Sequence, residues 1–202
     1  PASATESTGL RRTGRPYGLP STFRHLRGTV EKSVQLCSNP AVIHTAYISL
    51  GSNIGDRELH LLRAVAEIGK LRGCRITALS GFYETEPVWP PQDNYLNAAL
   101  RLETDLEPGE LLAHLLRIER EIFQRTREVP WGPRRMDLDI LLYDDLTLDT
   151  PELVIPHARL HERRFALAPL KEIAPEAVHP RLGKTVAQLL RAAPDTGKVR
   201  KI

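Results

Sequence analysis

Hydrophobic and polar positions alternate with a period of two along residues 95–103 and 136–143, and this period predicts two β-strands. In the second stretch the two faces hold Met136, Leu138, Ile140 and Leu142 on one side and Asp137, Asp139 and Tyr143 on the other. Residues 45–51 form a short apolar run that ends at Gly51, which predicts a buried strand, and residues 75–83 predict another. We expect the apolar faces of these strands to pack against helices.

Apolar residues at helical spacing predict two longer helices. The first begins after Asp56, which is suited to cap it, and ends near Lys70, shortly before Gly73. The second begins at Pro108 and ends near Gln124. Their apolar stripes contain Leu61, Leu62, Val65, Ile68 and Leu71 in the first helix, and Leu111, Leu112, Leu115, Ile118 and Ile122 in the second.

The remaining segments are shorter and less regular. Residues 84–94 are rich in proline and predict a loop, whereas residues 146–148 and 153–155 predict short strands. A mainly apolar segment runs to Ile173, a short helix is expected at 186–190, and no internal repeat is found. We therefore expect one folded domain over residues 45–193 and a frayed C-terminal tail over 194–202.

Residues 1–44 form a basic leader. Its first 40 residues hold only two acidic side chains, Glu6 and Glu31, among several arginines, and they are rich in Gly, Pro, Ser and Thr. Such a composition cannot build a hydrophobic core and predicts disorder. Arginine and serine enrichment is also typical of an organelle transit peptide, which is the alternative interpretation.

Composition excludes several classes of protein. The chain of 202 residues is 41% hydrophobic and 26% charged, as expected for an ordinary globular protein. No apolar run approaches the roughly 20 residues that cross a bilayer. The two cysteines, Cys37 and Cys74, are too few for a disulfide scaffold, which favours a reducing compartment. A net charge of +3 suggests affinity for anions but is modest for a dedicated nucleic-acid-binding protein.

The candidate chemistry lies at Asp137 and Asp139. On a strand that rises about 3.3 Å per residue, their Cα atoms lie roughly 7 Å apart on one face. Two neighbouring carboxylates repel each other, and a bound cation relieves this repulsion. Magnesium usually takes one or two carboxylates together with phosphate oxygens and water, so the pair is typical of a metal–phosphate site. A half-buried strand with two solvated aspartates would show the same alternation, and for a bare Asp-x-Asp this is the commoner case.

The residues around this pair favour the functional interpretation. Arg125, Arg127, Arg134 and Arg135 precede the aspartates closely, and guanidinium groups grip phosphate oxygens well. Gly132 and Pro133 fix a turn immediately before Arg134 and Arg135. His157 and His161 are spaced four apart, but no third zinc ligand is evident, so a zinc site is not expected.

Several short motifs, in one order, resemble those of a known family. They are residues 46–53 (AYISLGSN), 82–85 (FYET), 95–99 (YLNAA), 131–134 (WGPR), 137–140 (DLDI), 155–157 (IPH) and 173–176 (IAPE). From about Ala46 to Leu190 the chain thus resembles the 6-hydroxymethyl-7,8-dihydropterin pyrophosphokinases of folate biosynthesis. The resemblance implies an α+β fold, a ferredoxin-like sandwich with a mainly antiparallel sheet flanked by helices.

The resemblance also implies a reaction and the residues that perform it. The β,γ-diphosphate of ATP moves in one step to the hydroxymethyl oxygen of the pterin, and AMP is released. Asp137 and Asp139 are expected to hold two Mg²⁺ ions. The other expected ATP contacts are the loop residues Arg125 and Arg127, the phosphate contacts Arg134, His157 and Arg163, and the nucleotide neighbours Glu119 and Ile140. From its place in the helix pattern alone, Glu119 would be an ordinary residue at the edge of the apolar stripe.

For the pterin, the resemblance implies a slot between two aromatic rings. Tyr95 and Phe165 are expected to stack on its faces, Asn97 and Thr85 to bond its polar edge, and Trp131 to lie nearby. Two positions depart from the family pattern, since Gln124 and Arg164 stand where glycines are usual. The loop from Arg125 to Trp131 is also about one residue short, so the assignment of its arginines could shift.

Two other functions could use some of the same residues. A ferredoxin-like RNA-binding module would stack bases on the sheet, but the paired aspartates would repel an RNA backbone. A two-metal nuclease would use the aspartates but would leave Tyr95, Asn97 and Phe165 without a role. We expect small-molecule substrates, no nucleic-acid or membrane partner, a monomer and a cytoplasmic location, with organelle targeting by the leader as the alternative.

Overall fold

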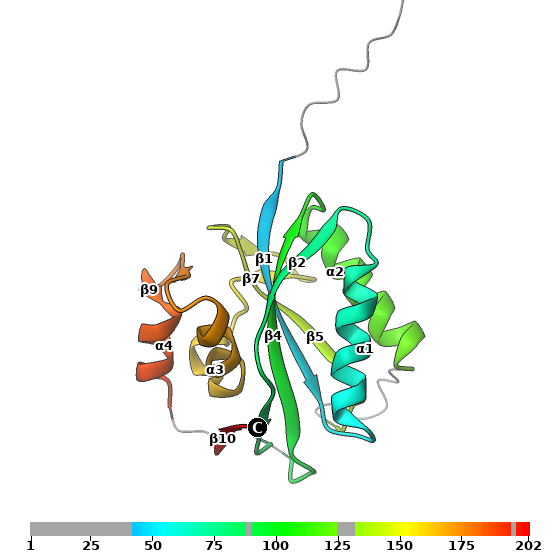
Figure 1. The fold of residues 1–202 in the computed structure, drawn as a ribbon. Helices are drawn as coiled ribbons and strands as arrows, with labels where there is room; N and C mark the ends of the chain where they lie inside the picture. Colours follow the sequence, from blue (N-terminus) through cyan, green and yellow to red (C-terminus); the bar gives the residue numbers. More distant parts are fainter. Residues whose placement is uncertain (1–41, 88–89, 125–131, 195–196) are drawn as a thin grey trace, which may run out of the picture. The chain divides into compact units, whose positions relative to one another are not determined.

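The central element is an antiparallel sheet whose order is β10-β3-β4-β1-β5, with β2 also paired to β4 (Figure 1). A computed structural model describes residues 42–87, 90–124, 132–194 and 197–202, which all fall within the unit Asn39–Ile202. The strands of this sheet are β1 (His44–Ser52), β2 (Cys74–Leu79), β3 (Tyr83–Thr85), β4 (Tyr95–Thr104), β5 (Asp137–Tyr143) and β10 (Val199–Lys201). Every pairing within it is antiparallel.

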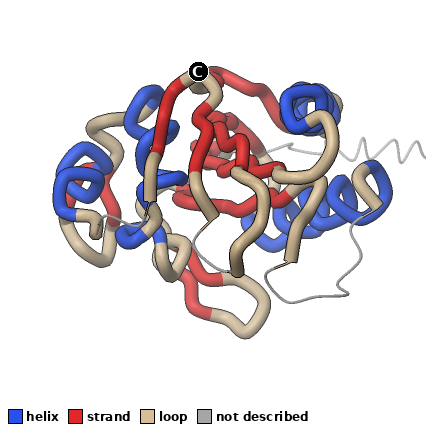
Figure 2. Tube along the Cα trace, turned by 90° about the horizontal axis from the view of Figure 1, so that it is seen from below, coloured by secondary structure: helices blue, strands red, loops and turns tan. Residues whose placement is uncertain are grey.

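Helices cover both faces of the sheet, as Figures 1 and 2 show. One face packs against α1 (Arg57–Gly69) and α2 (Pro108–Arg117), and the other against α3 (Arg164–Ile173) and α4 (Val186–Ala192). The smaller elements are η1 (Ile118–Ile122), β6 (Leu148–Asp149), β7 (Val154–Ile155), η2 (Leu160–Glu162), β8 (Val178–His179) and β9 (Lys184–Thr185). This arrangement is the α+β sandwich implied by the family resemblance.

The apolar stripes form two separate cores. Ile48, Leu61, Leu100 and Leu115 belong to the core between the sheet and α1 and α2. The second core lies under α3 and α4 and includes Leu141 and Leu167. Both predicted longer helices therefore pack against the sheet through most of the expected residues, but the prediction is wrong for Leu62, which is 47% exposed.

Local signals explain the ends of the helices. Asp56 caps α1 by accepting a hydrogen bond from the backbone N–H of Leu59 (3.0 Å), as predicted. At α2, Pro108 is in the first turn, and Glu107 and Glu110 form a capping box. The second helix does not stay α-helical to Gln124, because α2 continues from Ile118 as the π-helical segment η1.

The strand predicted at 75–83 is interrupted. The backbone N–H of Ser80 donates to the carbonyl of Ala99 (2.9 Å), but the backbone N–H of Ala99 donates to the hydroxyl of Ser80 (2.9 Å), so only half of the pairing is between backbone groups. The chain then resumes as β3, so Glu84 and Thr85 belong to a strand and not to the predicted loop. The side-chain bond explains why β2 and β3 are separate strands on the same side of β4.

The alternation predicted along β5 is wrong after Ile140. Ile140 pairs with Ile48 and Leu142 with Tyr47, so Leu141 is an extra residue, a β-bulge. Leu142 therefore joins Leu141 in the core under α3, and Tyr143 returns to the other core. Asp137 and Asp139 precede the bulge and are not affected by it.

The tail predicted to fray after residue 193 includes a strand. Val199, Arg200 and Lys201 pair with Thr85, Glu84 and Tyr83, so β10 covers the outer edge of β3. In the predicted leader, residues 1–41 lie outside the described part of the chain, and β1 begins at His44.

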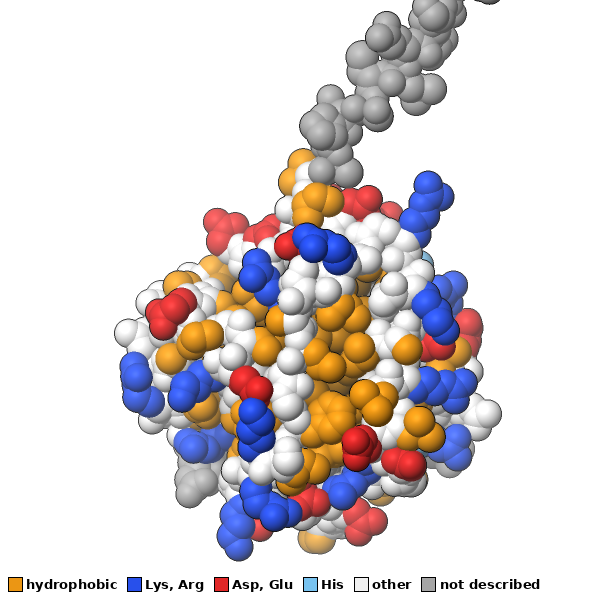
Figure 3. Space-filling view, viewed as in Figure 1, with side chains coloured by type: hydrophobic (Ala, Val, Ile, Leu, Met, Phe, Trp, Pro, Cys, Tyr) orange, Lys and Arg blue, Asp and Glu red, His pale blue; other side chains and the backbone are white. Residues whose placement is uncertain are grey.

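The outer edge of β2 has no partner strand among the described residues. Figure 3 shows hydrophobic side chains gathered at the middle of the face that carries β2, with charged side chains around them. Leu59 and Leu62 of α1 and Leu79 of β2 are among the exposed large hydrophobic side chains. In the described ranges, no helix has the length and apolar character that crossing a membrane requires.

Candidate active site

Asp137 and Asp139 lie on the same face of β5, as predicted. Their neighbours Leu138 and Ile140 point into the core under α1 and α2, so the two carboxylates face the side of α3. Their side chains are 29% and 35% exposed, which leaves them accessible to a ligand. The strand thus presents two carboxylates on an open surface while its other face anchors it in the core.

Basic groups surround the two carboxylates. Arg134 donates from Nη1 to Oδ1 of Asp137 (3.0 Å), and Arg163 donates from Nη1 to Oδ2 of Asp139 (3.3 Å). Both arginine side chains are largely buried, with exposures of 20% and 17%. Burial lowers the pKa of Arg134, but the charge and the hydrogen bond of Asp137, together with the charges of Tyr95 and Asp139, outweigh this and the net shift is upward. Two fixed guanidinium groups therefore stand beside the acids, as expected for phosphate contacts.

His157 is the third basic side chain at this place, with Nε2 3.9 Å from Oδ2 of Asp139. Burial, followed by the positive charge of Arg163, lowers its pKa from 6.5 to about 4, so the ring is neutral at pH 7. The backbone N–H of Arg159 donates to Nδ1 (3.2 Å), so the hydrogen of the neutral ring is on Nε2. His157 therefore presents a neutral N–H donor to the site.

Glu119 is buried, with 2% of its surface exposed, and is not an ordinary edge residue of the helix. It lies in η1, and its Oε1 accepts a hydrogen bond from the backbone N–H of Leu138 (2.7 Å), between the two aspartates. Widened turns of this kind occur often at functional sites. Ile140, in contrast, has its side chain in the core at 3% exposure, so it could contact a nucleotide only through its backbone.

Asn97 and Thr85, which are expected to bond the polar edge of the pterin, lie close together. Nδ2 of Asn97 donates to Oγ1 of Thr85 (2.7 Å), and each residue is 3% exposed. Gly51 lies between Asn97 on β4 and Asp137 on β5, because it pairs with both. A Cβ at Gly51 would lie 2.9 Å from Oδ1 of Asn97. Glycine at this position therefore leaves room for the amide.

The two predicted aromatic walls come from different layers. Tyr95 begins β4 and lies beside Gly51, and Phe165 lies in the first turn of α3. The guanidinium carbon of Arg163 is 5.6 Å from the centre of the Phe165 ring, so this arginine connects the aromatic wall to Asp139. The predicted residues Arg125, Arg127 and Trp131 lie outside the described residues.

Asn53 is the last residue of the motif 46–53, and no local pattern predicts its role. Its Oδ1 accepts from the backbone N–H of Arg134 (2.8 Å), and its own N–H donates to the carbonyl of Arg134 (3.1 Å). Its Nδ2 donates to Oε1 of Gln92 (2.8 Å) and to the carbonyl of Asp93 (3.3 Å). Asn53 thus joins three loops at the edge of the site.

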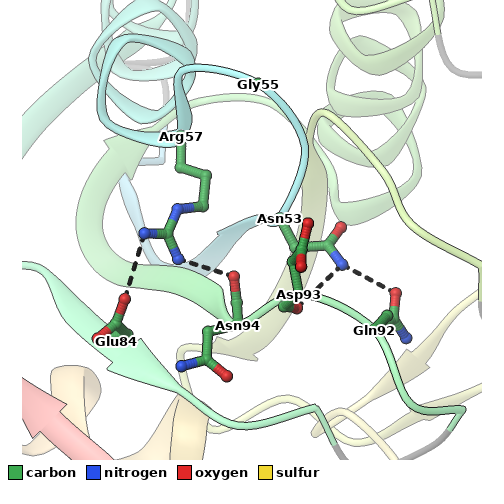
Figure 4. A pocket seen from close by; sticks show the side chains of 7 residues that line it. All are labelled: Asn53, Gly55, Arg57, Glu84, Gln92, Asp93 and Asn94. Carbon is green, nitrogen blue, oxygen red and sulfur yellow. Dashed lines mark hydrogen bonds and ion pairs between the residues drawn. The ribbon is translucent and has the colours of Figure 1, made fainter.

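A polar pocket of about 490 Å³ adjoins this junction (Figure 4). It is lined by Asn53, Gly55, Arg57, Glu84, Gln92, Asp93 and Asn94. Arg57 spans it, donating to Oε1 of Glu84 (3.2 Å) and to the carbonyl of Asn94 (2.8 Å). Since neither Asp137 nor Asp139 lines this pocket, it lies beside the paired carboxylates and is separate from them.

We expect Asn53→Ala to loosen the three loops. The substitution removes three side-chain hydrogen bonds at a residue that is 3% exposed, so the free energy of unfolding should fall by about 1–3 kcal/mol. Chemical denaturation measures this loss. Asn94→Ala is the control, because the exposed Asn94 contributes only its backbone carbonyl to Arg57. If the two variants were equally stable, the side chain of Asn53 would not hold the three loops together.

Comparison with known proteins places the chain in a family. The family model for 7,8-dihydro-6-hydroxymethylpterin-pyrophosphokinase (HPPK) matches residues 47–175. The 2-amino-4-hydroxy-6-hydroxymethyldihydropteridine pyrophosphokinase of Bacillus subtilis is 50% identical over 129 residues, which cover 63% of this chain and 77% of that protein. The protein of the same name from Synechocystis is 42% identical over 151 residues, covering 75% of this chain and 77% of that protein.

Solved structures show the same fold. The wild-type HPPK-DHPS of Plasmodium falciparum, crystallised with pteroate, matches with a TM-score of 0.62 at 15% identity. The match covers 77% of this chain and 45% of that one, so this chain spans less than half of its length. The family match, the relatives and the fold together decide among the functions weighed from sequence. The chain belongs to the 7,8-dihydro-6-hydroxymethylpterin-pyrophosphokinase family and is an ATP-dependent diphosphotransferase of folate biosynthesis.

Proposed function

We propose that this chain transfers diphosphate from ATP to 6-hydroxymethyl-7,8-dihydropterin at the face of β5 that carries Asp137 and Asp139. The observation that carries the proposal is the convergence of these acids with Arg134, Arg163 and His157 on one open surface. A bare pair of solvated aspartates would not require two largely buried arginines beside it. Acids and fixed cations side by side suit a metal-bound polyphosphate.

The two carboxylates fit Mg²⁺. Within the described ranges, no group of three or more His, Cys, Asp or Glu side chains could hold a metal. A pair of carboxylates nevertheless suffices for Mg²⁺, which takes its other ligands from phosphates and water. We propose that Asp137 and Asp139 hold two ions. When bound, these neutralise charge on the phosphates and stabilise the entering and leaving oxygens.

The side chains around the acids would hold the triphosphate. Arg134 and Arg163 are positioned to exchange part of their bonding to the acids for phosphate oxygens once metal neutralises the carboxylates. His157 would donate its Nε2 hydrogen to a phosphate oxygen without adding a positive charge. Glu119 fixes the backbone of Leu138 and so keeps both acids in register. Because this transfer depends mainly on positioning and charge neutralisation, these groups can supply most of what it requires.

The pterin would lie over the sheet between Tyr95 and Phe165, with its polar edge at Asn97 and Thr85. Two strand spacings separate Asn97 from Asp137, about 10 Å, which leaves room for a flat ring over Gly51. The hydroxymethyl oxygen would then attack the β-phosphorus, the bond from that phosphorus to the α,β-bridging oxygen would break, and AMP would leave. The hydroxyl proton is released to solvent.

Three further residues belong to the proposal by family resemblance. We assign Arg125 and Arg127 to the phosphates, as arginines that close over them, and Trp131 to the neighbourhood of the pterin. Their positions in the sequence, between η1 and the segment that holds Arg134, support this assignment. That this protein is a monomer and is located in the cytoplasm are predictions from the sequence.

Incubation with ATP, Mg²⁺ and 6-hydroxymethyl-7,8-dihydropterin tests the proposal. We expect AMP and the pterin diphosphate in equal amounts, no reaction after chelation with EDTA, and recovery when Mg²⁺ is restored. The products are separated by ion-exchange chromatography. Formation of ADP, or a rate that chelation leaves unchanged, would contradict it.

A further inference from the structure

The strand that carries Thr85 depends on the C-terminal end of the described chain. β3 has only three residues and pairs with β4 on one side. On its other side it pairs with β10, and the pairing is extended by the bond from the N–H of Ile202 to the carbonyl of Phe82 (3.0 Å). Residues far from the proposed site in sequence thus hold the strand that forms its polar edge.

Glu172 joins this strand to α3. Its Oε2 accepts from the hydroxyl of Tyr83 (2.8 Å), and its Oε1 accepts from Nζ of Lys201 (2.8 Å) and from the N–H of Gly81 (3.2 Å). One carboxylate therefore connects α3 with the segment that begins β3 and with β10. Burial raises the pKa of Glu172, but its bonds to Lys201, Tyr83 and Gly81 outweigh this and the net shift is downward. Burial and the bond to Glu172 raise the pKa of Tyr83 to about 12.

The same helix carries one wall of the ring slot. Phe165 and Glu172 are seven residues apart in α3, which is close to two helical turns, so they share one face about 10 Å apart along the axis. That face is turned toward β3 and β4, since Phe165 packs on the core under α3 and Glu172 reaches Tyr83. The distance between α3 and the sheet therefore sets the separation of Phe165 from Tyr95 and Thr85.

We propose that Glu172, through Tyr83 and Lys201, is a positioning residue that sets the width of the pterin slot. The proposal rests on the proposed function, because it takes Phe165, Tyr95, Thr85 and Asn97 as the pterin contacts. Glu172 touches neither substrate. It acts by fixing α3 against β3, so its loss lowers the affinity for the flat ring, whereas the acids and Arg134 of the nucleotide site, which are held on or next to β5, stay in place.

The opposite face of β3 has its own connections, which keep the strand in place when Glu172 is altered. Glu84 accepts from Arg200 of β10 (2.8 Å) and from Arg57 of α1 (3.2 Å). These two bonds, that of Arg200 first, lower the pKa of Glu84. Variants at Glu172 should therefore remain folded and differ in the spacing between α3 and the sheet.

Glu172→Gln and Tyr83→Phe test the proposal with nearly unchanged side-chain shapes. We expect each to raise the dissociation constant of 6-hydroxymethyl-7,8-dihydropterin about tenfold, measured by calorimetry with Mg²⁺ and α,β-methylene-ATP. The affinity for this ATP analogue and kcat at saturating pterin should stay within about twofold. Glu67→Gln is the matched control, because Glu67 forms a comparable ion pair with Lys70 (2.9 Å) on α1. Unchanged pterin affinity in Glu172→Gln, or an equal loss for the ATP analogue, would overturn the proposal.

A double-mutant cycle with Phe165→Ala separates positioning from general weakening. If Glu172 acts through the ring wall, Glu172→Gln should cost less affinity in the Phe165→Ala background than in the natural chain. Full additivity would overturn the proposal. A wrong assignment of the ring slot would give a different result. Phe165→Ala and Tyr95→Ala would then leave the pterin affinity unchanged, although the wild-type protein still forms AMP.

Discussion

Asp137→Ala and Asp139→Ala should each lower kcat for AMP formation by about 10³-fold or more. Metal ions at such a site stabilise transition-state charge by several kcal/mol, and each 1.36 kcal/mol corresponds to a factor of ten in rate. Because the two acids share one face and hold two ions in our proposal, each removal should disrupt both ions. A quenched-flow assay with saturating ATP, Mg²⁺ and pterin measures this loss.

Stability distinguishes loss of chemistry from loss of fold. Both aspartates are about one third exposed but their arginine partners are largely buried, so removing either ion pair should lower the free energy of unfolding by about 1–3 kcal/mol and leave the protein folded. Asp149→Ala is the control, since Asp149 is 72% exposed and also pairs with an arginine, Arg181 (3.4 Å). This variant should retain full activity. Near-normal rates in both site variants would refute the metal assignment.

Gly51→Ala should weaken pterin binding by at least tenfold. The new methyl group would lie 2.9 Å from Oδ1 of Asn97, so the amide must move. Asn97 is 3% exposed and bonds Thr85 at 2.7 Å, so movement disturbs both groups of the proposed polar edge. A binding measurement with Mg²⁺ and an unreactive ATP analogue follows the pterin directly.

Gly109→Ala provides the comparison for this substitution. Gly109 lies in α2 with no atom within 4 Å of the position that a Cβ would take. Alanine is the better helix former by about 1 kcal/mol, so this variant should be as stable as the natural chain or more stable, with unchanged binding. If Gly51→Ala binds pterin as well as Gly109→Ala does, Asn97 is not a pterin contact.

Structural features that lie within one helix or strand could be predicted from the sequence. The two-residue period placed Asp137 and Asp139 together, and the helical stripes of α1 and α2 lie in the core except for the exposed Leu62. Asp56 and Pro108 marked where these helices begin. Each of these features depends on side chains close to one another in the chain, so a local rule is sufficient.

Features that depend on distant segments were missed or wrong. The bulge at Leu141 appears only when β5 is aligned with β1, because it is a mismatch in pairing and has no residue of its own that marks it. The π-helical turn buries Glu119, which the stripe pattern had placed at an edge. β10 was predicted to fray because one valine followed by two basic residues gives no signal until β3 is beside them.

The residues of the candidate site also fall into those that a local pattern reveals and those that depend on distant segments. The acids and the arginine at Arg134 come from one continuous stretch and could be recognised there. The roles of Asn53 and Glu172 could not, because their partners lie up to 81 and 91 residues away. The assignment of His157, Arg163, Asn97 and Phe165 needed the family resemblance, since no local pattern distinguishes them from structural residues.

The extra residue in β5 divides that strand into two parts with separate tasks. Before Leu141 the side facing α3 belongs to the acids, and from Leu141 onward the same side is filled by leucines that hold the helix. Without the bulge, Leu142 would face the core under α1 and α2 and Tyr143 would face α3; the bulge instead places two leucines under the helix. Deleting Leu141 would restore regular pairing with β1, with Leu142 still toward α3 and Tyr143 still toward the other core, so this deletion should cost only the packing of Leu141.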